Sequence, residues 1–308
     1  MPKPLLIAGP TASGKSALAL GLARRLGGAV INADSQQVYR DWRILSARPT
    51  PEDEAEAPHF LYGHVALDAE YSAGAWLRDL VGVLEQCHAR DLRPIITGGT
   101  GLYFKVLTEG LAPIPPIPPE IRARAEAELQ RLGLARLYSR LATRDPASAA
   151  ALDRANPMRV LRAWEVLEST GTGLAEWRRA TAAPLLPLDR TVAIALTPPR
   201  PWLRARCDAR FDAMLEQGVL DEAADVMALG LDPSLPGMKA AGAPELMAHL
   251  AGQLSLDQAV TRAKTATRRY AKRQLTWVRN QMFRWQVLSD HNAAENLAIA
   301  TELTENAG

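Results

Sequence analysis

The run GPTASGKS, from Gly9 to Ser16, limits the possible folds more than any other part of this sequence. It fits the phosphate-loop pattern G-x-x-x-x-G-K-[ST] and lies between an apolar segment at residues 5–9 and an amphipathic one at residues 16–26. A strand, this loop and a helix together form an anion-binding nest of backbone N–H groups. We therefore predict phosphate binding here, in preference to a glycine-rich turn without function. The predicted phosphate-binding residues are Gly9, Pro10, Thr11, Ala12, Ser13, Gly14, Lys15 and Ser16.

Strand-like and helix-like segments alternate after the loop. Apolar segments at residues 29–34 and 94–99 are expected strands, and residues 72–90 are an expected helix. Alternation of this kind predicts an α/β fold, with a P-loop NTPase-like parallel sheet flanked by helices. Ligands of such sheets bind beyond the carboxyl ends of the strands.

A proline-rich connector at residues 111–120 ends the alternation, and only helices are expected until a β-branched strand at residues 191–197. Asp145 and Asn156 are expected helix N-caps within that stretch. We therefore predict an α/β catalytic core at residues 1–111 and 189–308, and an all-helical insertion at residues 112–188. Near the C-terminus, Ser255 and Gln258 form a capping-box pattern that opens a long helix through about residue 285.

Composition narrows the class of protein. Apolar residues make up 47% and charged residues 23% of the 308 residues, as in soluble globular proteins. We expect no signal peptide and no membrane span, and the two cysteines lack metal-ligand spacing, so a cytoplasmic protein without a zinc site is expected. The net charge is +2, yet residues 258–289 hold eight basic residues and no acidic one, which leaves 2 − 8 = −6 for the rest. This segregation predicts a face that binds a polyanion.

Acidic residues at strand ends near the loop indicate which reaction the loop serves. An ATPase commonly has an acid at the end of a strand facing the loop, but the expected strand at residues 94–99 continues as TGGTG without one. A motor or switch ATPase is therefore disfavoured, whereas a nucleotide kinase stays open. The strand at residues 29–34 does end in an acid, Asp34, followed by Ser35, Gln36 and Gln37.

Two interpretations of Asp34 stand at even odds on the residues alone. It can cap a following helix, or it can accept a proton from an adenine whose edge neighbouring amides read. Thr100 offers a hydroxyl between two glycines, and a tight turn or a ligand contact explains it equally well.

Six motifs in order resemble the tRNA isopentenyltransferase family, whose members are tRNA dimethylallyltransferases. They are GPTASGKS, ADSQQVY, GGTGLY, NPMRVLRAWEV, LRARCDARFDAML and AKRQLTWVRNQ, and they extend from residue 5 to about residue 285. The resemblance implies transfer of a dimethylallyl group from dimethylallyl diphosphate to N6 of adenosine 37 in tRNA, giving N6-isopentenyladenosine, with Mg²⁺ as cofactor. The loop is then expected to hold an allylic diphosphate rather than ATP.

The resemblance also implies roles for individual residues. Asp34 is the implied general base, with Lys15, Thr100 and Arg206 as further catalytic residues and Ser16 as the metal ligand. Arg206 is favoured over Arg210 against the diphosphate, although both remain candidates. The candidate tRNA-binding residues are Asp34, Ser35, Gln36, Gln37, Thr100, Arg159, Val160, Leu161, Arg162, Ala163, Lys239, Gly242, Lys272, Arg273, Gln274, Trp277 and Arg279.

Two features qualify these assignments. Ala243 stands where the family usually has an aromatic residue after glycine, and we expect an altered fit without loss of activity. Tyr270 and Trp277 lie seven apart, so packing in a core is favoured for both over contact with RNA.

Several alternatives remain open. Adenylate isopentenyltransferase, which acts on free AMP, does not need a basic helix or a helical insertion. A P-loop nucleotide kinase and an RNA-binding module with an inactive loop are the others. We expect a monomer whose partners are the tRNA anticodon stem-loop and dimethylallyl diphosphate.

Overall fold

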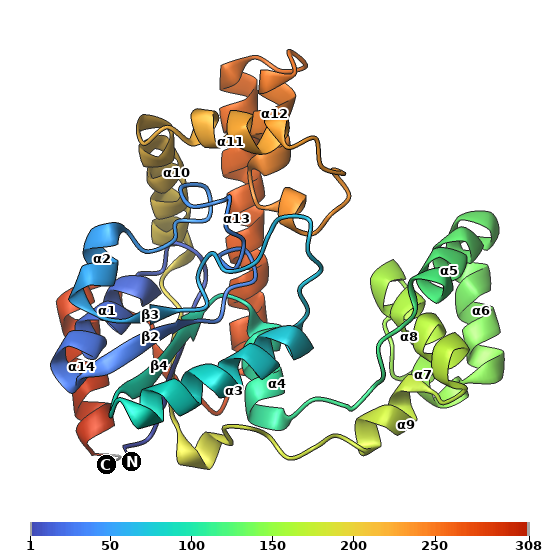
Figure 1. Ribbon diagram of the computed structural model, residues 1–308, viewed down its shortest axis with the longest axis horizontal. Helices are drawn as coiled ribbons and strands as arrows, with labels where there is room; N and C mark the ends of the chain where they lie inside the picture. The colour runs from blue at the N-terminus through green and yellow to red at the C-terminus, as the bar shows by residue number, and fades with distance from the viewer. Residues whose placement is uncertain (1, 307–308) are drawn as a thin grey trace. The chain divides into compact units, whose positions relative to one another are not determined.

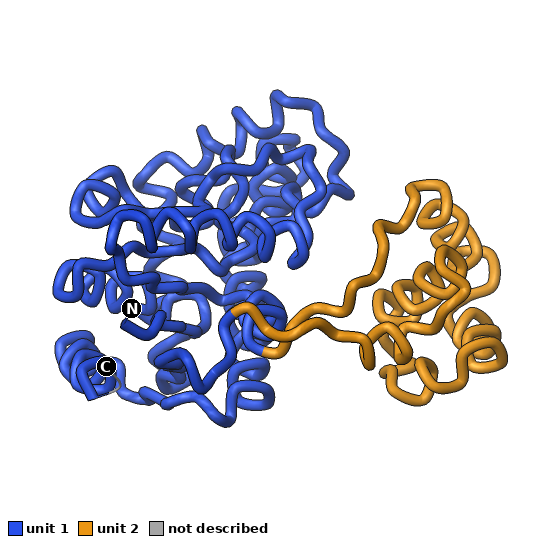
Figure 2. Tube along the Cα trace, turned by 60° about the horizontal axis from the view of Figure 1, so that its bottom comes forward, with its two compact units in different colours: residues 1–108, 186–308 blue, residues 109–185 orange. Residues whose placement is uncertain are grey.

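The computed structural model describes residues 2–306 and divides the chain into two compact units. Unit 1 consists of Met1–Thr108 and Leu186–Gly308, and unit 2 consists of Glu109–Leu185 (Figure 2).

A six-stranded sheet forms the centre of unit 1. Its order is β3-β2-β4-β1-β5-β6, and every neighbouring pair is parallel, which confirms the predicted fold class (Figure 1). The sequence did not predict β3 and β6, because strands of two or three residues carry no periodic signal. The strands are β1 Leu5–Ala8, β2 Gly28–Asn32, β3 His59–Phe60, β4 Arg93–Gly98, β5 Val192–Leu196 and β6 Gln286–Leu288.

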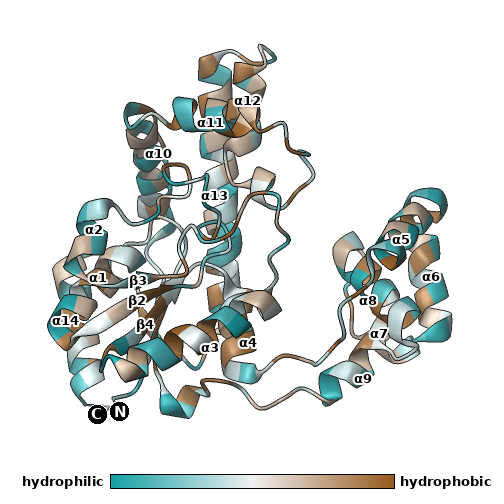
Figure 3. Ribbon diagram, viewed as in Figure 1, coloured by the Kyte–Doolittle hydropathy of each residue, from teal (hydrophilic) through white to brown (hydrophobic). Residues whose placement is uncertain are grey.

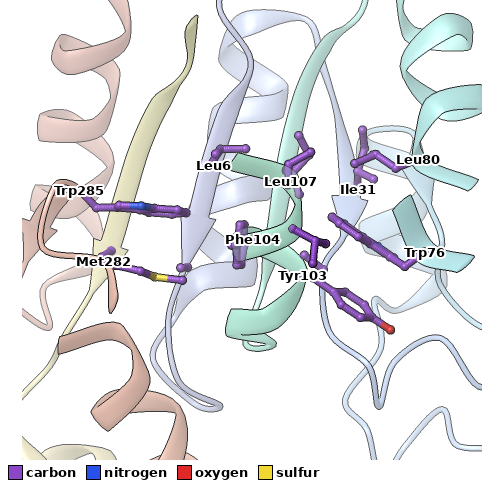
Figure 4. Close-up of a cluster of buried hydrophobic side chains, with 14 of the residues drawn as sticks. Leu6, Ile31, Trp76, Leu80, Tyr103, Phe104, Leu107, Met282 and Trp285 are labelled. Carbon is purple, nitrogen blue, oxygen red and sulfur yellow. The ribbon is translucent and has the colours of Figure 1, made fainter. Parts of the chain in front are cut away.

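The two faces of the sheet follow from the alternation of side chains along buried parallel strands. Leu6, Ile31 and Ile96 lie in one hydrophobic cluster with residues of α3 and α4, as Figure 4 shows for the first two. The adjacent Leu5 and Ile95 lie in the cluster on the other face, with residues of α1 and α14. The helices of unit 1 are α1 Lys15–Leu26, α2 Pro51–Glu56, α3 Ala73–Ala89, α4 Gly101–Glu109, α10 Arg200–Glu216, α11 Val219–Ala228, α12 Ala243–Leu250, α13 Leu256–Gln281 and α14 Ala293–Glu305.

The long basic helix α13 begins as predicted and ends earlier than predicted. Ser255 and Gln258 form the expected capping box. The helix ends at Gln281 rather than near residue 285, because Met282 leaves the helical conformation and is buried. Trp285 then packs edge-to-face on Phe104, with ring centroids 5.2 Å apart, and the chain continues into β6 (Figure 4).

Sheet order brings three loops together. Strands β2, β4 and β1 are neighbours, so the segments after their carboxyl ends meet at one edge of the sheet. These segments contain Asp34, the GGTG turn and the phosphate loop. The fold therefore places the three motifs of the first half of the sequence side by side.

Unit 2 is all helical and has a core of its own. Asp145 and Asn156 cap α7 and α8 as predicted, each accepting a backbone N–H from the first turn.

No helix among residues 2–306 is long and apolar enough to cross a membrane. In unit 1, Figure 3 shows both hydrophobic and hydrophilic residues around α3, as expected for a helix with one face on a sheet. The helices of unit 2 are α5 Pro119–Leu132, α6 Leu134–Arg144, α7 Pro146–Ala150, α8 Pro157–Thr170 and α9 Leu174–Arg179.

A core substitution in unit 2 tests whether its cluster is independent. Leu137 is fully buried in that cluster, so Leu137→Ala should destabilise unit 2 by about 3 kcal/mol. Hydrogen exchange should show faster exchange in α5, α6 and α8 while the strands of unit 1 stay protected. Met158→Ala is the control, since Met158 is 72% exposed and its loss should change stability by less than about 0.5 kcal/mol. Equal deprotection of the sheet would contradict two separate cores.

Candidate functional site

The phosphate loop has the backbone geometry of an anion nest. Gly14 is in the left-handed region with φ of 91°, and Ala12 adopts a positive φ of 64°. Gly14 caps the N-terminus of α1, whose first N–H groups have no acceptor within the helix. Lys15 is buried, with Nζ 3.5 Å from the carbonyl oxygen of Pro10. The charge of Lys15 and the backbone N–H groups of the loop therefore lie together at the N-terminus of α1.

A cavity of about 240 Å³ opens beside the loop, and its lining comes entirely from unit 1. One part is polar and contains the loop, Asp34 and Gln36. The other part is apolar and was not predicted, because it comes from segments distant in the sequence that have no motif. Its residues are Leu45, Ala47, Phe211, Met214 and Ala241. The cavity thus suits a ligand with an anionic head and an apolar tail.

Asp34 is held rigidly at the end of β2. Its backbone N–H donates to Asn32 Oδ1 at 2.8 Å, and Asn32 Nδ2 donates to the Asp34 carbonyl oxygen at 3.0 Å. Asp34 Oδ1 accepts the Gln36 N–H at 3.0 Å within a turn, and no helix follows, so the helix-cap interpretation of Asp34 is wrong. A polar Asn32 in an otherwise apolar strand was the available signal for this support.

Hydroxyl groups gather next to Asp34. Thr100 Oγ1 accepts the Ser35 N–H at 2.8 Å and donates to Ser35 Oγ at 3.1 Å. The Tyr270 hydroxyl hydrogen bonds with both side chains, and burial and the charge of Asp34 raise the pKa of Tyr270. Tyr270 therefore faces the cavity, and its predicted placement in a core is wrong. Trp277 does pack against the hydrophobic cluster on the α4 face of the sheet, as predicted.

The GGTG turn is fitted to α13 by its glycines. A Cβ atom at Gly99 would lie 2.0 Å from Gln274 Nε2, and one at Gly101 would lie 2.0 Å from Trp277 Nε1. Only glycine therefore allows this close approach of turn and helix.

Two candidate amides already have partners in the protein. Gln274 Oε1 accepts the Thr11 N–H at 2.8 Å, whereas Gln274 Nε2 is buried without a partner in the described part of the chain. Gln37 Nε2 donates to the carbonyl oxygens of Ser46 and Ala47, at 3.0 and 2.7 Å. Both amides thus position other parts of the site.

The two candidate arginines of α10 lie differently. Arg210 donates through an Nη atom to the Thr11 hydroxyl, and its Nε is buried without a partner among residues 2–306. Arg206 is exposed, and its guanidinium lies 5.2 Å from the centroid of the Trp202 ring. Both line the cavity, but only Arg210 is hydrogen bonded to the loop.

The basic face of α13 is smaller than its sequence suggests. Lys264 pairs with Asp212 and Arg268 with Asp208, each at 2.6 Å, so two of the cations are neutralised by α10. Lys272, Arg273 and Arg279 are exposed, although Arg273 lies over the Tyr270 ring. The remaining exposed cations are Arg262, Arg269 and Arg284.

The other candidate tRNA-binding residues are not among those that line the cavity. In α8 of unit 2, Val160, Leu161 and Ala163 are buried in the core of that unit, which leaves Arg159 and Arg162 at its surface. In unit 1, Lys239 is exposed. Gly242 is buried, and a Cβ on it would meet Phe211 at 3.1 Å and Leu45 at 3.3 Å.

Burial alters the charges at the loop. It lowers the pKa of Lys15 to about 8, with the charge of Asp34 opposing this shift and that of Arg210 adding to it. Burial likewise lowers the pKa of Arg210. Buried cations of this kind gain most from an anionic ligand that neutralises them.

Comparisons with known proteins show which family this chain is similar to. The family model described as IPP transferase matches residues 37–281, and the model described as isopentenyl transferase matches residues 3–62. A tRNA dimethylallyltransferase from Cereibacter sphaeroides is 56% identical over 92% of this chain and 95% of its own length. A tRNA dimethylallyltransferase from a Bradyrhizobium species is 52% identical over 98% of this chain and 97% of its own length.

Two solved structures are also similar. A tRNA isopentenylpyrophosphate transferase from Bacillus halodurans is 31% identical, with a TM-score of 0.69 and coverage of 100% of this chain and 98% of that one. A eukaryotic dimethylallyltransferase acting on tRNA is 26% identical, with a TM-score of 0.82 over 99% of this chain and 80% of that one.

Binding of inorganic pyrophosphate should be linked to protonation of Lys15. Below pH 8 the lysine is charged and favours the anion; as pH rises through 8 the charge is lost, so affinity should fall by up to about tenfold per pH unit. Calorimetric titrations from about pH 7 to about pH 9, in two buffers of different ionisation enthalpy, measure both the affinity and the proton uptake. The Lys15→Arg variant stays charged over this pH range, so its pH dependence reports the protonation of the pyrophosphate alone. The same pH dependence in both proteins would refute the linkage.

Proposed function

The chain belongs to the IPP transferase family, and on that premise we propose that it transfers a dimethylallyl group from dimethylallyl diphosphate to N6 of adenosine 37 in tRNA. The observation that carries this proposal is the two-part cavity. Its cationic phosphate loop matches a diphosphate, and its apolar wall matches a five-carbon prenyl group rather than a nucleoside.

The polar end of the cavity stabilises the leaving group. As the bond between C1 of the prenyl group and the diphosphate oxygen breaks, negative charge grows on the departing pyrophosphate. The N–H groups of the loop, Lys15 and Arg210 are directed at that charge, and Arg206 lies on the same lining. Fixed donors of this kind typically lower a barrier by about 3 kcal/mol each.

The polar end of the cavity offers few protein ligands for Mg²⁺, which suits an ion that also binds phosphate oxygens. Among residues 2–306 no group of three or more His, Cys, Asp or Glu side chains can hold a metal ion, whereas the Ser16 hydroxyl is exposed at the cavity. Mg²⁺ commonly binds through one or two protein oxygens plus phosphate oxygens. Ser16 would hold it, and the ion would neutralise charge on the diphosphate.

Asp34 is the proposed general base. The N6 lone pair attacks C1 of the prenyl group, the new N–C bond forms, and the N6 proton passes to the Asp34 carboxylate. Asn32 holds the backbone of Asp34, and the Gln36 N–H donates to its carboxylate. Thr100 accepts the N–H of Ser35, the residue that follows Asp34. The adenosine must leave its stack to reach the cavity, at a cost of a few kcal/mol.

RNA meets the protein through exposed cations. Lys272, Arg273 and Arg279 of α13 are proposed to contact the tRNA backbone, with the exposed Arg159 of the helical unit as a further contact. Arg162 is a weaker candidate, because it is partly buried and pairs with Glu165 at 3.4 Å. Gln36 and Ser35 lie next to Asp34, where they would face the adenine. The insertion, expected at residues 112–188, would thereby contact the anticodon stem-loop.

Asp34→Asn should lower single-turnover prenyl transfer by about 10²- to 10⁴-fold while tRNA affinity is retained. The substitution removes the proton acceptor but keeps Oδ1 for the Gln36 N–H. The assay follows label from dimethylallyl diphosphate into unmodified tRNA, with AMP and ATP tested in parallel. Label on AMP would favour the free-nucleotide enzyme, and ADP formed from ATP would favour a kinase. Undiminished transfer by the variant would exclude Asp34 as the base.

The salt dependence of tRNA binding should separate free cations from paired ones. Lys272→Ala should lower the slope of log affinity against log salt by about 0.7, because one phosphate contact and its released counterion are lost. Lys264→Ala is the matched control on the same helix, and its slope should not change because Asp212 already neutralises Lys264. Filter binding over a salt series measures both. Equal effects of the two variants would contradict the assigned RNA-binding face.

A further inference from the structure

The apolar wall of the cavity is built partly on a loop with two internal backbone hydrogen bonds, from the Ala47 N–H to the Ile44 carbonyl oxygen at 2.9 Å and from the Arg48 N–H to the Arg43 carbonyl oxygen at 3.0 Å. Leu45, Ser46 and Ala47 line the cavity from the segment between Trp42 and Arg48, which is neither helix nor strand. Ala47 adopts a positive φ of 52°, which costs energy for a residue other than glycine. Contacts from elsewhere add to the internal bonds of the loop in holding this conformation.

Glu222 of α11 supplies the main contact. Its Oε1 accepts the N–H groups of Arg43 and Ile44 at 2.6 and 2.7 Å, and its Oε2 accepts that of Leu45 at 2.8 Å. One carboxylate thus binds three successive backbone donors through charge-assisted hydrogen bonds. The Trp42 indole N–H adds a bond to the Gly237 carbonyl oxygen at 2.9 Å. The wall is therefore held in place by α11 and by Gly237, both of which are distant from the loop in the sequence.

The held segment closes the apolar part of the cavity. Leu45 and Phe211 both approach the Cα of Gly242, where an added Cβ would lie 3.3 Å from one and 3.1 Å from the other. Met214 follows Phe211 on α10, and both line the cavity although they are almost fully buried. Leu45, Phe211 and Met214 belong to one core cluster, so the apolar part has a closed end where the cavity stops against packed side chains.

We propose that Leu45 and Met214 limit the prenyl donor to a single isoprene unit, with Glu222 as the positioning residue that keeps Leu45 in place. This inference rests on the proposed prenyl transfer and adds to it a length limit. A donor with one more isoprene unit carries about five further carbons, for which the closed end has no room unless side chains are shortened.

The double variant Leu45→Ala, Met214→Ala tests the limit. Each change removes about three heavy atoms from the closed end, which together roughly match the added isoprene unit. The ratio of kcat/KM for geranyl diphosphate to that for dimethylallyl diphosphate, with the same tRNA, should rise at least about tenfold. Ile44→Ala is the control from the same loop, since Ile44 packs on the neighbouring core and does not line the cavity; its ratio should not change.

Glu222→Gln tests the positioning role. The glutamine amide group presents a donor to the Leu45 N–H, so the wall loosens and the same ratio should rise, with KM for dimethylallyl diphosphate raised more than kcat is lowered. Asp225→Asn, an exposed carboxylate on the same helix, is the control and should leave the ratio unchanged. A variant that is merely unstable would lose both donors equally, so the ratio separates positioning from folding.

The outcomes distinguish this inference from the proposed function. Absence of dimethylallyl transfer by the unchanged protein would refute the function itself. Transfer by the unchanged protein, together with an unaltered donor ratio in the double variant, would overturn the length limit alone. A raised ratio in the double variant but not in Glu222→Gln would keep the limit and remove Glu222 from it.

Discussion

One buried hydrogen bond joins the two parts of the site that must act together. The Thr11 N–H, in the phosphate loop, donates to Gln274 Oε1 in the middle of the basic helix α13. The bond forms only because Gly99 and Gly101 let that helix lie directly on the GGTG turn. Arg210 holds the same threonine through its hydroxyl, so helices α10 and α13 both converge on the loop. An isolated phosphate loop could bind an anion, but this arrangement also places it next to the basic helix α13.

The site is assembled at the expense of stability. Lys15 and Asp34 are buried and Arg210 is partly buried beside them, and burial lowers the pKa of both cations, which means that the folded protein holds charge where water would solvate it better. Ala12 and Ala47 occupy the left-handed region, at a cost on the order of 1 kcal/mol each. Such costs are offset elsewhere, in the two clusters that cover the faces of the sheet, one of which is drawn in Figure 4. An anionic ligand would reduce the free-energy cost of burying these charges, because it neutralises the cations.

The parts of this structure that the sequence predicts are those encoded locally. The apolar strand β1, the capping box at Ser255 and the strand–loop–helix order around the phosphate loop are each encoded within a few residues, and each is found as predicted. Pairings between distant segments could not be predicted in the same way. Lys264 and Arg268 look like free cations because their acidic partners are on α10, and Tyr270 shares a helical face with Trp277 yet reaches the hydroxyls near Asp34. Glu222 looks like an ordinary polar residue of α11, because the loop it holds lies about 180 residues earlier.

The lack of an acid after β4 is consistent with the chemistry that the cavity suits. Transfer of a phosphoryl group to water or to a hydroxyl commonly needs a residue that positions or deprotonates the attacking oxygen near the loop. Cleavage of an allylic diphosphate needs the opposite: positive charge at the leaving group and no nucleophile there, because the bond that breaks joins carbon to oxygen. The carboxylate then belongs where the amine loses its proton, at the end of the neighbouring strand. Asp34 lies there, within the electrostatic reach of Lys15 and Arg210, so one parallel sheet carries the cationic phosphate loop and this carboxylate on separate loops.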